Sequence, residues 1–263
     1  MGMTLAALGR LTAHRELLFT WALRDIRVRY KQSLMGVGWA ILQPLLMTVI
    51  FTVVFTRFAR IPTGGIPYPI FSYCALLPWT FFGNAVSFAT PSVVNNMNLV
   101  TKVYFPREIF PLASILASFF DFLVASVIFL GMMIYYGVSP GPLFLLVPLV
   151  VVLQVTLTVG IATFASAINV FYRDVRFLVP LGMQLWMYAS PVIYPVSAVP
   201  ENLLPFYMLN PMAAVIDSYR RVILQGAMPD WHYLGLAASM SGLFLLFGYG
   251  YFKRVEMKFA DII

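Results

Sequence analysis

Arg24 to Leu46 reads RDIRVRYKQSLMGVGWAILQPLL, and within this stretch a basic segment passes without a break into an uncharged one. The basic part predicts a water-facing surface. The apolar part predicts the start of a membrane-spanning helix, because about 20 mostly apolar residues cross the hydrocarbon layer. Gly36 and Gly38 lie at the junction, where small residues allow a bend or a close approach. We therefore expect a surface helix that leads into a first span.

The segment before the junction is predicted to be an amphipathic helix. At about 100° per residue, four apolar residues fall on one stripe, namely Phe19, Leu23, Ile26 and Tyr30. The accompanying cations are Arg24, Arg27, Arg29 and Lys31. Such a helix can lie in the headgroup layer, can dock against a cytosolic partner, or can be only an anchor that obeys the positive-inside rule. All three interpretations are open at this point.

The composition is that of an integral membrane protein. The chain has 263 residues, of which 61% are hydrophobic and 10% are charged, whereas soluble domains carry about 25% charged residues. The net charge of +7 does not indicate nucleic acid binding, because the cations lie at the ends of apolar runs and form no basic face with interleaved aromatics. With Cys74 as the only cysteine and two distant histidines, His14 and His232, we expect neither an intrachain disulfide nor a metal site.

Six apolar segments are long enough to span a membrane. They cover residues 34–56, 70–94, 109–136, 143–170, 177–194 and 233–252. The third and fourth should form a hairpin, because only the turn sequence GVSPGP separates them. We predict one all-α transmembrane domain over residues 1–263, with an interface helix within 1–33, spans one to five within 34–194, outer helices in 195–232 and a cytosolic tail at 253–263.

The distribution of Lys and Arg predicts the orientation. With both termini in the cytosol, 13 of the 17 cations fall on the cytosolic side, as the positive-inside rule requires. The four on the outer side are Arg57, Arg60, Arg220 and Arg221. The first long apolar run begins only at Leu34, after six cations, so we expect no cleavable signal peptide. The predicted location is a bacterial cytoplasmic membrane.

The outer segment at 195–232 has helix signals. Asn210 as N-cap, Pro211 at the first helical position and Gly226 just past the end bracket one helix. Val215, Tyr219 and Val222 would form its apolar face, with Asp217, Arg220 and Arg221 elsewhere. A shorter helix is expected from Pro200, with Glu201 near its positive end. These helices would be a structural cap or an outer gate, and the gate candidates are Asn210, Pro211, Tyr219 and Arg220.

No catalytic constellation is present in the sequence. None of the four lysines follows a glycine, so the phosphate loop GxxxxGK[ST] is absent and the chain cannot bind ATP in that way. A Ser/His/Asp set would need His14 or His232, which are predicted on opposite sides of the membrane. We therefore predict a protein that is not an enzyme and that carries no cofactor of its own.

Asp121 is the one acid well inside a predicted span. A carboxylate that faced lipid there would cost about 2.5 to 3.5 kcal/mol on insertion scales, so it must face protein or water. We expect polar groups of a neighbouring helix to satisfy it. A proton-coupling role is disfavoured, because the spans supply no basic partner.

Aromatic residues make up 16% of the chain and gather near the ends of the spans. An interfacial belt is the commoner explanation of such a distribution. The alternative is a ring of aromatic faces that lines a conduit, for which the candidates are Trp39, Trp79, Trp186, Tyr188 and Tyr194.

Two short cytosolic loops carry charges of both signs. They are KVYFPREIFPL after the second span and FYRDVR after the fourth. The positive-inside rule does not require Glu108 or Asp174, which favours a protein-binding surface over a simple topological stop. The candidate coupling residues are Lys102, Phe105, Pro106, Arg107, Glu108, Arg173 and Asp174.

The chain resembles the permease subunits of type-2 ABC exporters of polysaccharides and polyol phosphates, which export O-antigen, capsule and teichoic acid. The resemblance covers nearly the whole length. It is carried, in order, by RDIRVRY with Gly36, Trp39 and Pro44, then FPREIFPL at 105–112, FYRDV at 171–175, SPVIYP at 190–195 and the pair Asn210–Pro211.

This resemblance implies a homodimer paired with two copies of a soluble ATP-binding subunit that would hold ATP and Mg. The loop with Phe105 to Glu108 would be the coupling element, and the outer helices would be the periplasmic gate. The family's substrate is typically carried on a lipid diphosphate, which Arg24, Arg27, Arg29 and Lys31 are placed to attract. A drug or lipid exporter is the alternative within the class, and a passive channel or a membrane scaffold is the alternative outside it.

Overall fold

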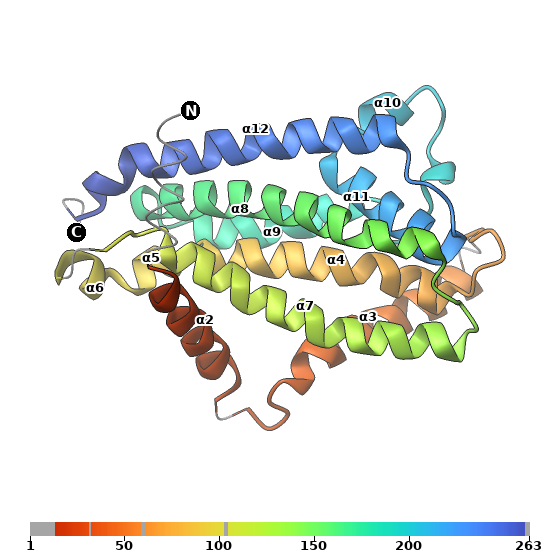
Figure 1. Cartoon of the computed structure of the whole chain (residues 1–263), viewed down its shortest axis with the longest axis horizontal. Coiled ribbons are helices and arrows are strands. Elements are labelled where there is room, and N and C mark those ends of the chain that lie inside the picture. The colour runs from red at the N-terminus through yellow and green to blue at the C-terminus, as the bar shows by residue number, and fades with distance from the viewer. Residues whose placement is uncertain (1–13, 32, 59–60, 103–104, 261–263) are drawn as a thin grey trace.

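The computed structural model describes residues 14–31, 33–58, 61–102 and 105–260, and the described residues form helices without strands. The helices are packed side by side into an elongated bundle (Figure 1). Their bounds are α2 Arg15–Tyr30, α3 Gly38–Arg57, α4 Tyr68–Ala89, α5 Ser92–Asn95, α6 Met97–Lys102, α7 Ile109–Tyr135, α8 Val147–Phe171, α9 Val175–Tyr188, α10 Leu204–Tyr207, α11 Pro211–Arg220 and α12 Trp231–Val255. Short 3-10 turns cover Pro142–Leu146, Val196–Ala198 and Glu256–Ala260, and a π turn covers Arg221–Gln225.

Four helical stretches in the described part of the chain are long and apolar enough to cross a membrane: Gly38–Arg57, Ile109–Tyr135, Pro142–Phe171 and Trp231–Phe259. They correspond to the first, third, fourth and sixth predicted spans. Helix α4, the second, has 22 residues but is buried at 16 of them, so it lies at the centre of the bundle. Helix α9, the fifth, has only 14 residues, because the backbone leaves the helix at Ala189 and does not continue to Tyr194 as predicted.

Helices α8 and α12 approach each other closely through two glycines. A Cβ added to Gly160 would lie 2.5 Å from the backbone of Phe244 and Leu245, and one added to Gly248 would overlap the carbonyl group of Gly160. Small residues are the usual means by which membrane helices bring their backbones together. This contact joins the middle of the predicted hairpin's second helix to the last long helix of the chain.

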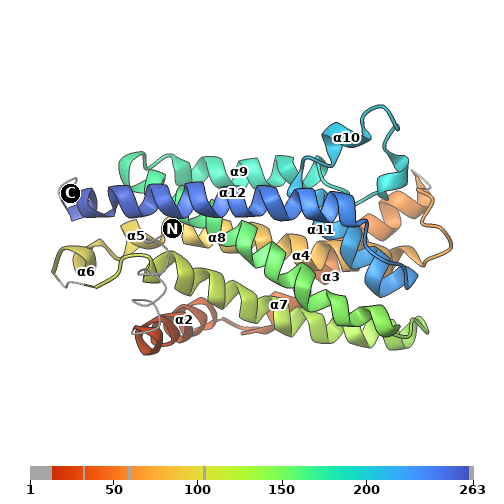
Figure 2. The same ribbon diagram turned by 45° about the horizontal axis from the view of Figure 1, so that its top comes forward.

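The junction between α2 and α3 is bent where the sequence predicts it. Gly36 adopts a positive φ of 52°, a conformation that glycine reaches without a Cβ penalty. Helix α3 therefore begins at Gly38, four residues later than predicted. Figure 1 shows that α2 and α3 meet at an angle, and Figure 2 shows α2 beside the first turns of α7.

The outer segment differs from its predicted form. Asn210 does cap α11, because its side chain accepts a hydrogen bond from the backbone N–H of Met212 at 3.1 Å, and Gly226 ends the helical run with a φ of 60°. However, α11 is not a surface helix with one apolar face, since every residue from Pro211 to Arg220 except Asp217 is buried. The shorter helix is a single turn, α10, and it begins after Glu201.

Candidate functional site

The docking of α2 against α7 depends on Asp121. The carboxylate of Asp121 accepts a hydrogen bond from the Tyr30 hydroxyl at 2.6 Å and forms an ion pair with Arg29. The acid predicted to need a neighbouring polar group is thus satisfied by the helix that precedes the first span. An ion pair that is largely withdrawn from water depends on both partners, so this contact fixes where α2 lies.

Two further contacts continue the same interface towards the start of α2. The Ser114 hydroxyl donates to the Asp25 carboxylate at 3.1 Å, and the Trp21 ring packs edge-on against Phe110 at 5.0 Å between centroids. Burial raises the pKa of the Asp25 carboxyl, while the bond from Ser114 and the charges of Arg24 and Arg29 lower it. Helix α2 is therefore held along its length by α7.

The predicted apolar stripe of α2 is divided between two environments. Tyr30 and Ile26 are half-buried, whereas Phe19 and Leu23 are 60% and 51% exposed. The face that contacts α7 carries Trp21, Asp25 and Arg29 together with Tyr30 of the stripe. Large exposed apolar side chains on a helix rich in cations are typical of helices that lie in a membrane interface.

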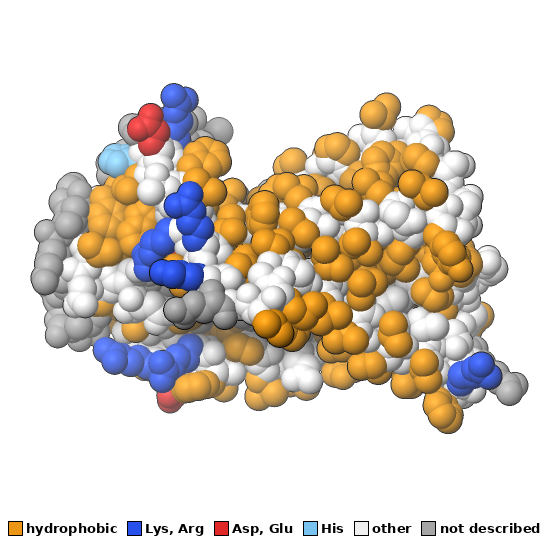
Figure 3. All heavy atoms as spheres, turned by 90° about the horizontal axis from the view of Figure 1, so that it is seen from below, with side chains coloured by type: hydrophobic (Ala, Val, Ile, Leu, Met, Phe, Trp, Pro, Cys, Tyr) orange, Lys and Arg blue, Asp and Glu red, His pale blue; other side chains and the backbone are white. Residues whose placement is uncertain are grey.

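The four cations of α2 and its end are not equivalent. Arg24 donates to the Asn96 side chain at 3.0 Å and covers the Trp21 ring, and Arg29 is engaged by Asp121. Arg27 and Lys31 are exposed, and their side chains bond to no described residue. Figure 3 shows Lys and Arg side chains gathered at the end of the molecule that holds α2, while hydrophobic side chains cover most of the same face beyond them.

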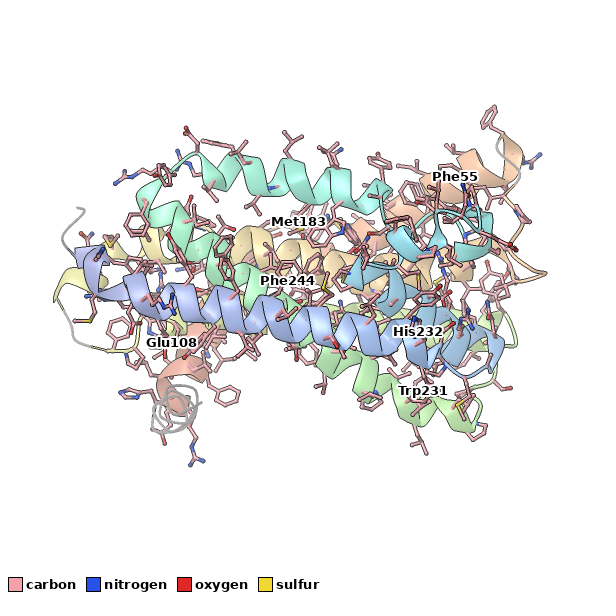
Figure 4. The ribbon with its side chains drawn as sticks, turned by 90° about the horizontal axis from the view of Figure 1, so that it is seen from above. Phe55, Glu108, Met183, Trp231, His232 and Phe244 are labelled. Atoms are coloured by element: carbon pink, nitrogen blue, oxygen red, sulfur yellow. The ribbon has the colours of Figure 1, made fainter. Side chains whose placement is uncertain are left out.

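Glu108, predicted to be a surface contact, is instead completely buried. Its carboxylate pairs with the Lys253 ammonium at 2.5 Å and accepts a hydrogen bond from the Tyr249 hydroxyl at 3.2 Å. Lys253 also bridges to Glu256 at 3.1 Å. Figure 4 shows Glu108 beside α12. The loop with Phe105 to Glu108 is thereby attached to the end of α12, a link that no local sequence signal could reveal.

The other residues of the two charged loops differ in accessibility. Arg107 donates to the backbone carbonyl of Glu256, and Phe105 packs edge-on against Phe110 at 5.3 Å. Pro106 is half-buried, whereas Arg173 and Asp174 are exposed. Lys102 is the last residue of α6, and its side chain is not among those that the structure describes.

A cavity of about 300 Å³ lies beside the bend, between α2, α3, α4 and α7. The charged residues that line it are Arg29 and Asp121. The remaining lining combines polar side chains with aromatic ones and includes Trp39. Of the five aromatic residues proposed to line a conduit, Trp39 is the one that lines this cavity.

The other four aromatic candidates have different environments. Trp79 is 5% exposed and belongs to the core, where it packs edge-on against Trp186. It therefore does not line an open conduit in this structure. The Trp186 indole donates to the Asn210 side chain at 2.9 Å, and Tyr194 donates to the carbonyl of Tyr188 at 3.1 Å. Tyr188 is 54% exposed.

Arg220 was predicted to lie away from the apolar face of an outer helix, and it is 2% exposed. Its guanidinium donates to the backbone carbonyls of Pro191, Val192 and Tyr194 at 2.5 to 3.0 Å and stacks over the Phe71 ring at 3.6 Å. It therefore holds the non-helical SPVIYP segment after α9. The prediction of a helix with one apolar face failed because the chain after α9 folds over α11 and covers Arg220.

Gln154 is a further buried polar residue that the sequence analysis did not select. Its amide donates to the Pro78 carbonyl at 2.7 Å and accepts from the Tyr219 hydroxyl at 3.0 Å. Gln154 of α8 thus gives the Pro78 carbonyl of α4 a further hydrogen bond, and Tyr219 of α11 satisfies the amide oxygen of Gln154. The signal in the sequence that could have identified Gln154 is its position as a polar amide inside an apolar run.

Comparison with known proteins assigns the family. The model of the ABC-2 type transporter family matches residues 16–224. The chain belongs to this family. Like other ABC-2 permeases, it is a multi-pass membrane protein, and the family's ATPase is a separate subunit.

Individual ABC-2 permeases are similar over almost their whole length. The O-antigen export system permease protein RfbA of Myxococcus xanthus is 30% identical over 95% of this chain and 96% of its own length. The protein of the same name from Klebsiella pneumoniae is 29% identical over 94% and 95%. The polysialic acid transport protein KpsM of Escherichia coli is 20% identical over 89% and 91%.

Proposed function

We propose that this chain is the transmembrane subunit of an ATP-driven exporter that moves a lipid-linked polysaccharide across the cytoplasmic membrane. The observation that carries the proposal is the end-to-end similarity to two O-antigen export permeases. The substrate chemistry is consistent with the need for a protein-lined path, because each sugar hydroxyl left unpaired in hydrocarbon would cost several kcal/mol.

The energy source in this proposal is a soluble subunit that holds ATP and Mg. The residues proposed to contact it are Arg173, Asp174 and Phe105 with Pro106, which lie on loops at the same end of the bundle as α2 (Figure 1). Arg107 and Glu108 act differently. They attach the loop to Glu256 and Lys253, so that a push on the loop is transmitted to α12.

The assembly is proposed to be a homodimer with six spans per chain and both termini in the cytosol. Helices α4 and α9 then supply the second and fifth spans, beyond the four that meet the length and hydropathy criteria. Helix α9 supports this, because Phe177, Leu181 and Leu185 are 65%, 54% and 63% exposed. Such a face is suited to lipid or to a second copy of the chain. Trp186, Tyr188 and Tyr194 would border the conduit there.

The test is ATP-driven export by the purified permease with its ATPase in liposomes. We expect ATP hydrolysis to rise with a lipid-linked polysaccharide and the polysaccharide to become protected from an external glycosidase. A drug or lipid exporter would respond to its own substrate and not to the glycan, and a passive channel would admit the glycan without ATP. Either result would contradict the proposal.

A further inference from the structure

The cavity beside the bend contains polar groups that the fold does not use. The side-chain amides of Gln43 and Asn84 and the hydroxyl of Thr80 line it, and none of the three forms a hydrogen bond with a described residue. Gln43 lies in the second turn of α3, inside an apolar run. Polar groups at such positions in a membrane helix are costly unless they face a partner or a cavity.

The aromatic part of the lining lies beside these polar groups. The aromatic residues that line the cavity are Tyr30, Trp39, Phe81, Phe88 and Phe122. Phe88 is covered on one face by the Arg29 guanidinium at 4.1 Å, whereas Trp39 is 50% exposed and its indole N–H has no described partner. A ligand can therefore pack on the Trp39 ring and bond to the indole at its edge.

The charge of the cavity excludes strongly ionic ligands. The charged side chains of the lining are Arg29 and Asp121, and they are paired with each other. A phosphate would meet the Asp121 carboxylate beside the only cation, and a cationic drug would meet Arg29 beside the only acid. The unused groups are neutral donors and acceptors, which match hydroxyl groups.

We propose that this cavity binds one neutral sugar ring, whose hydroxyls bond to the side chains of Gln43, Thr80 and Asn84. The apolar face of the ring packs on Trp39. The volume of about 300 Å³ is at the small end of ligand pockets and suits one ring, not a chain. This inference rests on the proposed function for its ligand, a sugar of the lipid-linked glycan, and it places that sugar next to the α2–α3 bend while the carrier's phosphates stay outside.

A thiol at Ala40 tests the site, because Ala40 lines the cavity without supplying a polar group. The Ala40→Cys variant of the permease–ATPase complex is modified in nanodiscs with a small water-soluble maleimide. The two probes are polyprenyl diphosphate alone and the same carrier bearing a neutral oligosaccharide. The reference reporter is Ser139→Cys, which is exposed at the tip of the α7–α8 hairpin. The native thiol Cys74 is buried.

We expect the glycan-bearing carrier, at ten times its dissociation constant, to slow modification of Ala40→Cys about tenfold, because only about one site in eleven is then free. The sugar-free carrier should change the rate little, and neither probe should affect Ser139→Cys. Adding Asn84→Leu should abolish the protection, whereas Asn202→Leu, which removes an exposed amide, should preserve it.

Equal protection by both carriers would overturn the inference, because the cavity would then hold the carrier and not the sugar. Absence of protection, or full protection in the Asn84→Leu variant, would overturn it as well. Export is measured separately by glycosidase protection in liposomes. If the complex exports the glycan but Ala40→Cys is not protected, sugar binding in the cavity is refuted and the proposed function stands. If the complex exports no glycan, the proposed function is refuted.

Discussion

The Lys253 ammonium lies 2.5 Å from the carboxylate of Glu108, which is completely buried. This pair joins the loop before α7 to the end of α12, two segments 145 residues apart. The charged loop and the last long helix are therefore one mechanical unit. In an ATP-driven transporter, such a unit can convey a movement of the loop into the bundle.

Breaking this pair should destabilise the protein. Glu108→Gln leaves Lys253 without its buried partner, and loss of one member of a buried pair costs about 3 to 5 kcal/mol. The double variant Glu108→Gln/Lys253→Met should be closer to the parent, because it leaves no buried ammonium unpaired and takes a partner only from the partly exposed Glu256. Thermal unfolding of the purified permease measures both. Lys258→Met, at an exposed position, is the control, and equal melting temperatures for all variants would contradict the role of the pair.

Asp121→Asn should leave transport largely intact. Tyr30 and Arg29 bond to different oxygens of Asp121, and asparagine keeps one acceptor oxygen for these donors, so α2 stays docked with a weaker contact. Asp121→Leu removes both acceptors and leaves Arg29 unpaired, and it should release α2. Export in liposomes and protease sensitivity of α2 are the measurements. Loss of export in a normally folded Asp121→Asn variant would instead indicate a coupling role for the carboxylate.

Gly248→Ala should weaken the packing of α8 against α12. The added methyl group would overlap the Gly160 carbonyl, and forced separation of packed helices costs about 1 to 3 kcal/mol. The expected result is a lower melting temperature of the purified protein. Gly250→Ala, two residues away, has open space at its Cβ position and should be neutral. A stable Gly248→Ala protein would show that the two helices separate without cost.

Arg220→Met should disorder the segment after α9. It removes the donors to Pro191, Val192 and Tyr194, and each buried carbonyl left unpaired costs about 1 to 3 kcal/mol. The neighbouring Arg221→Met is the matched control, because Arg221 makes a partly exposed i, i+4 pair with Asp217, and such pairs contribute about 0 to 1 kcal/mol. Limited proteolysis at residues 189–195 compares the two variants. Similar cleavage in both variants would show that Arg220 does not hold this segment in place.

The free cations of α2 should attract the diphosphate of the lipid carrier. Neutralising Arg27 and Lys31 with Gln removes about 1 kcal/mol of attraction per charge and should weaken carrier binding by roughly tenfold or more. Arg57→Gln, at the opposite end of α3, is the control. If the quadruple variant that also neutralises Arg24 and Arg29 assembled with its ATPase and exported at the normal rate, a role of these cations in export would be excluded.

Residue type and spacing were sufficient for much of the fold. Four of the six predicted spans, the bend at Gly36, the cap at Asn210 and the helix end at Gly226 were predicted correctly, because each depends on a backbone preference or on local periodicity. The fifth span ends before Ala189 instead of at Tyr194. Two further predictions that failed concern Glu108 and Arg220. Both are charged residues on short segments, where solvent exposure is the usual outcome, and both are buried by partners distant in the sequence.

The sequence by itself determined that the chain crosses a membrane in helices, that it lacks a phosphate loop and that its cations gather around a basic helix before the first span. These properties follow from composition and periodicity, which act over one or two helical turns. Only the tertiary structure decided that Asp121 bonds to Arg29 and Tyr30 and that Glu108 pairs with Lys253. It also decided that unused polar groups of α3 and α4 line one cavity. The physical reason is that pairing of buried polar groups depends on which helices become neighbours, and a linear pattern does not encode that choice.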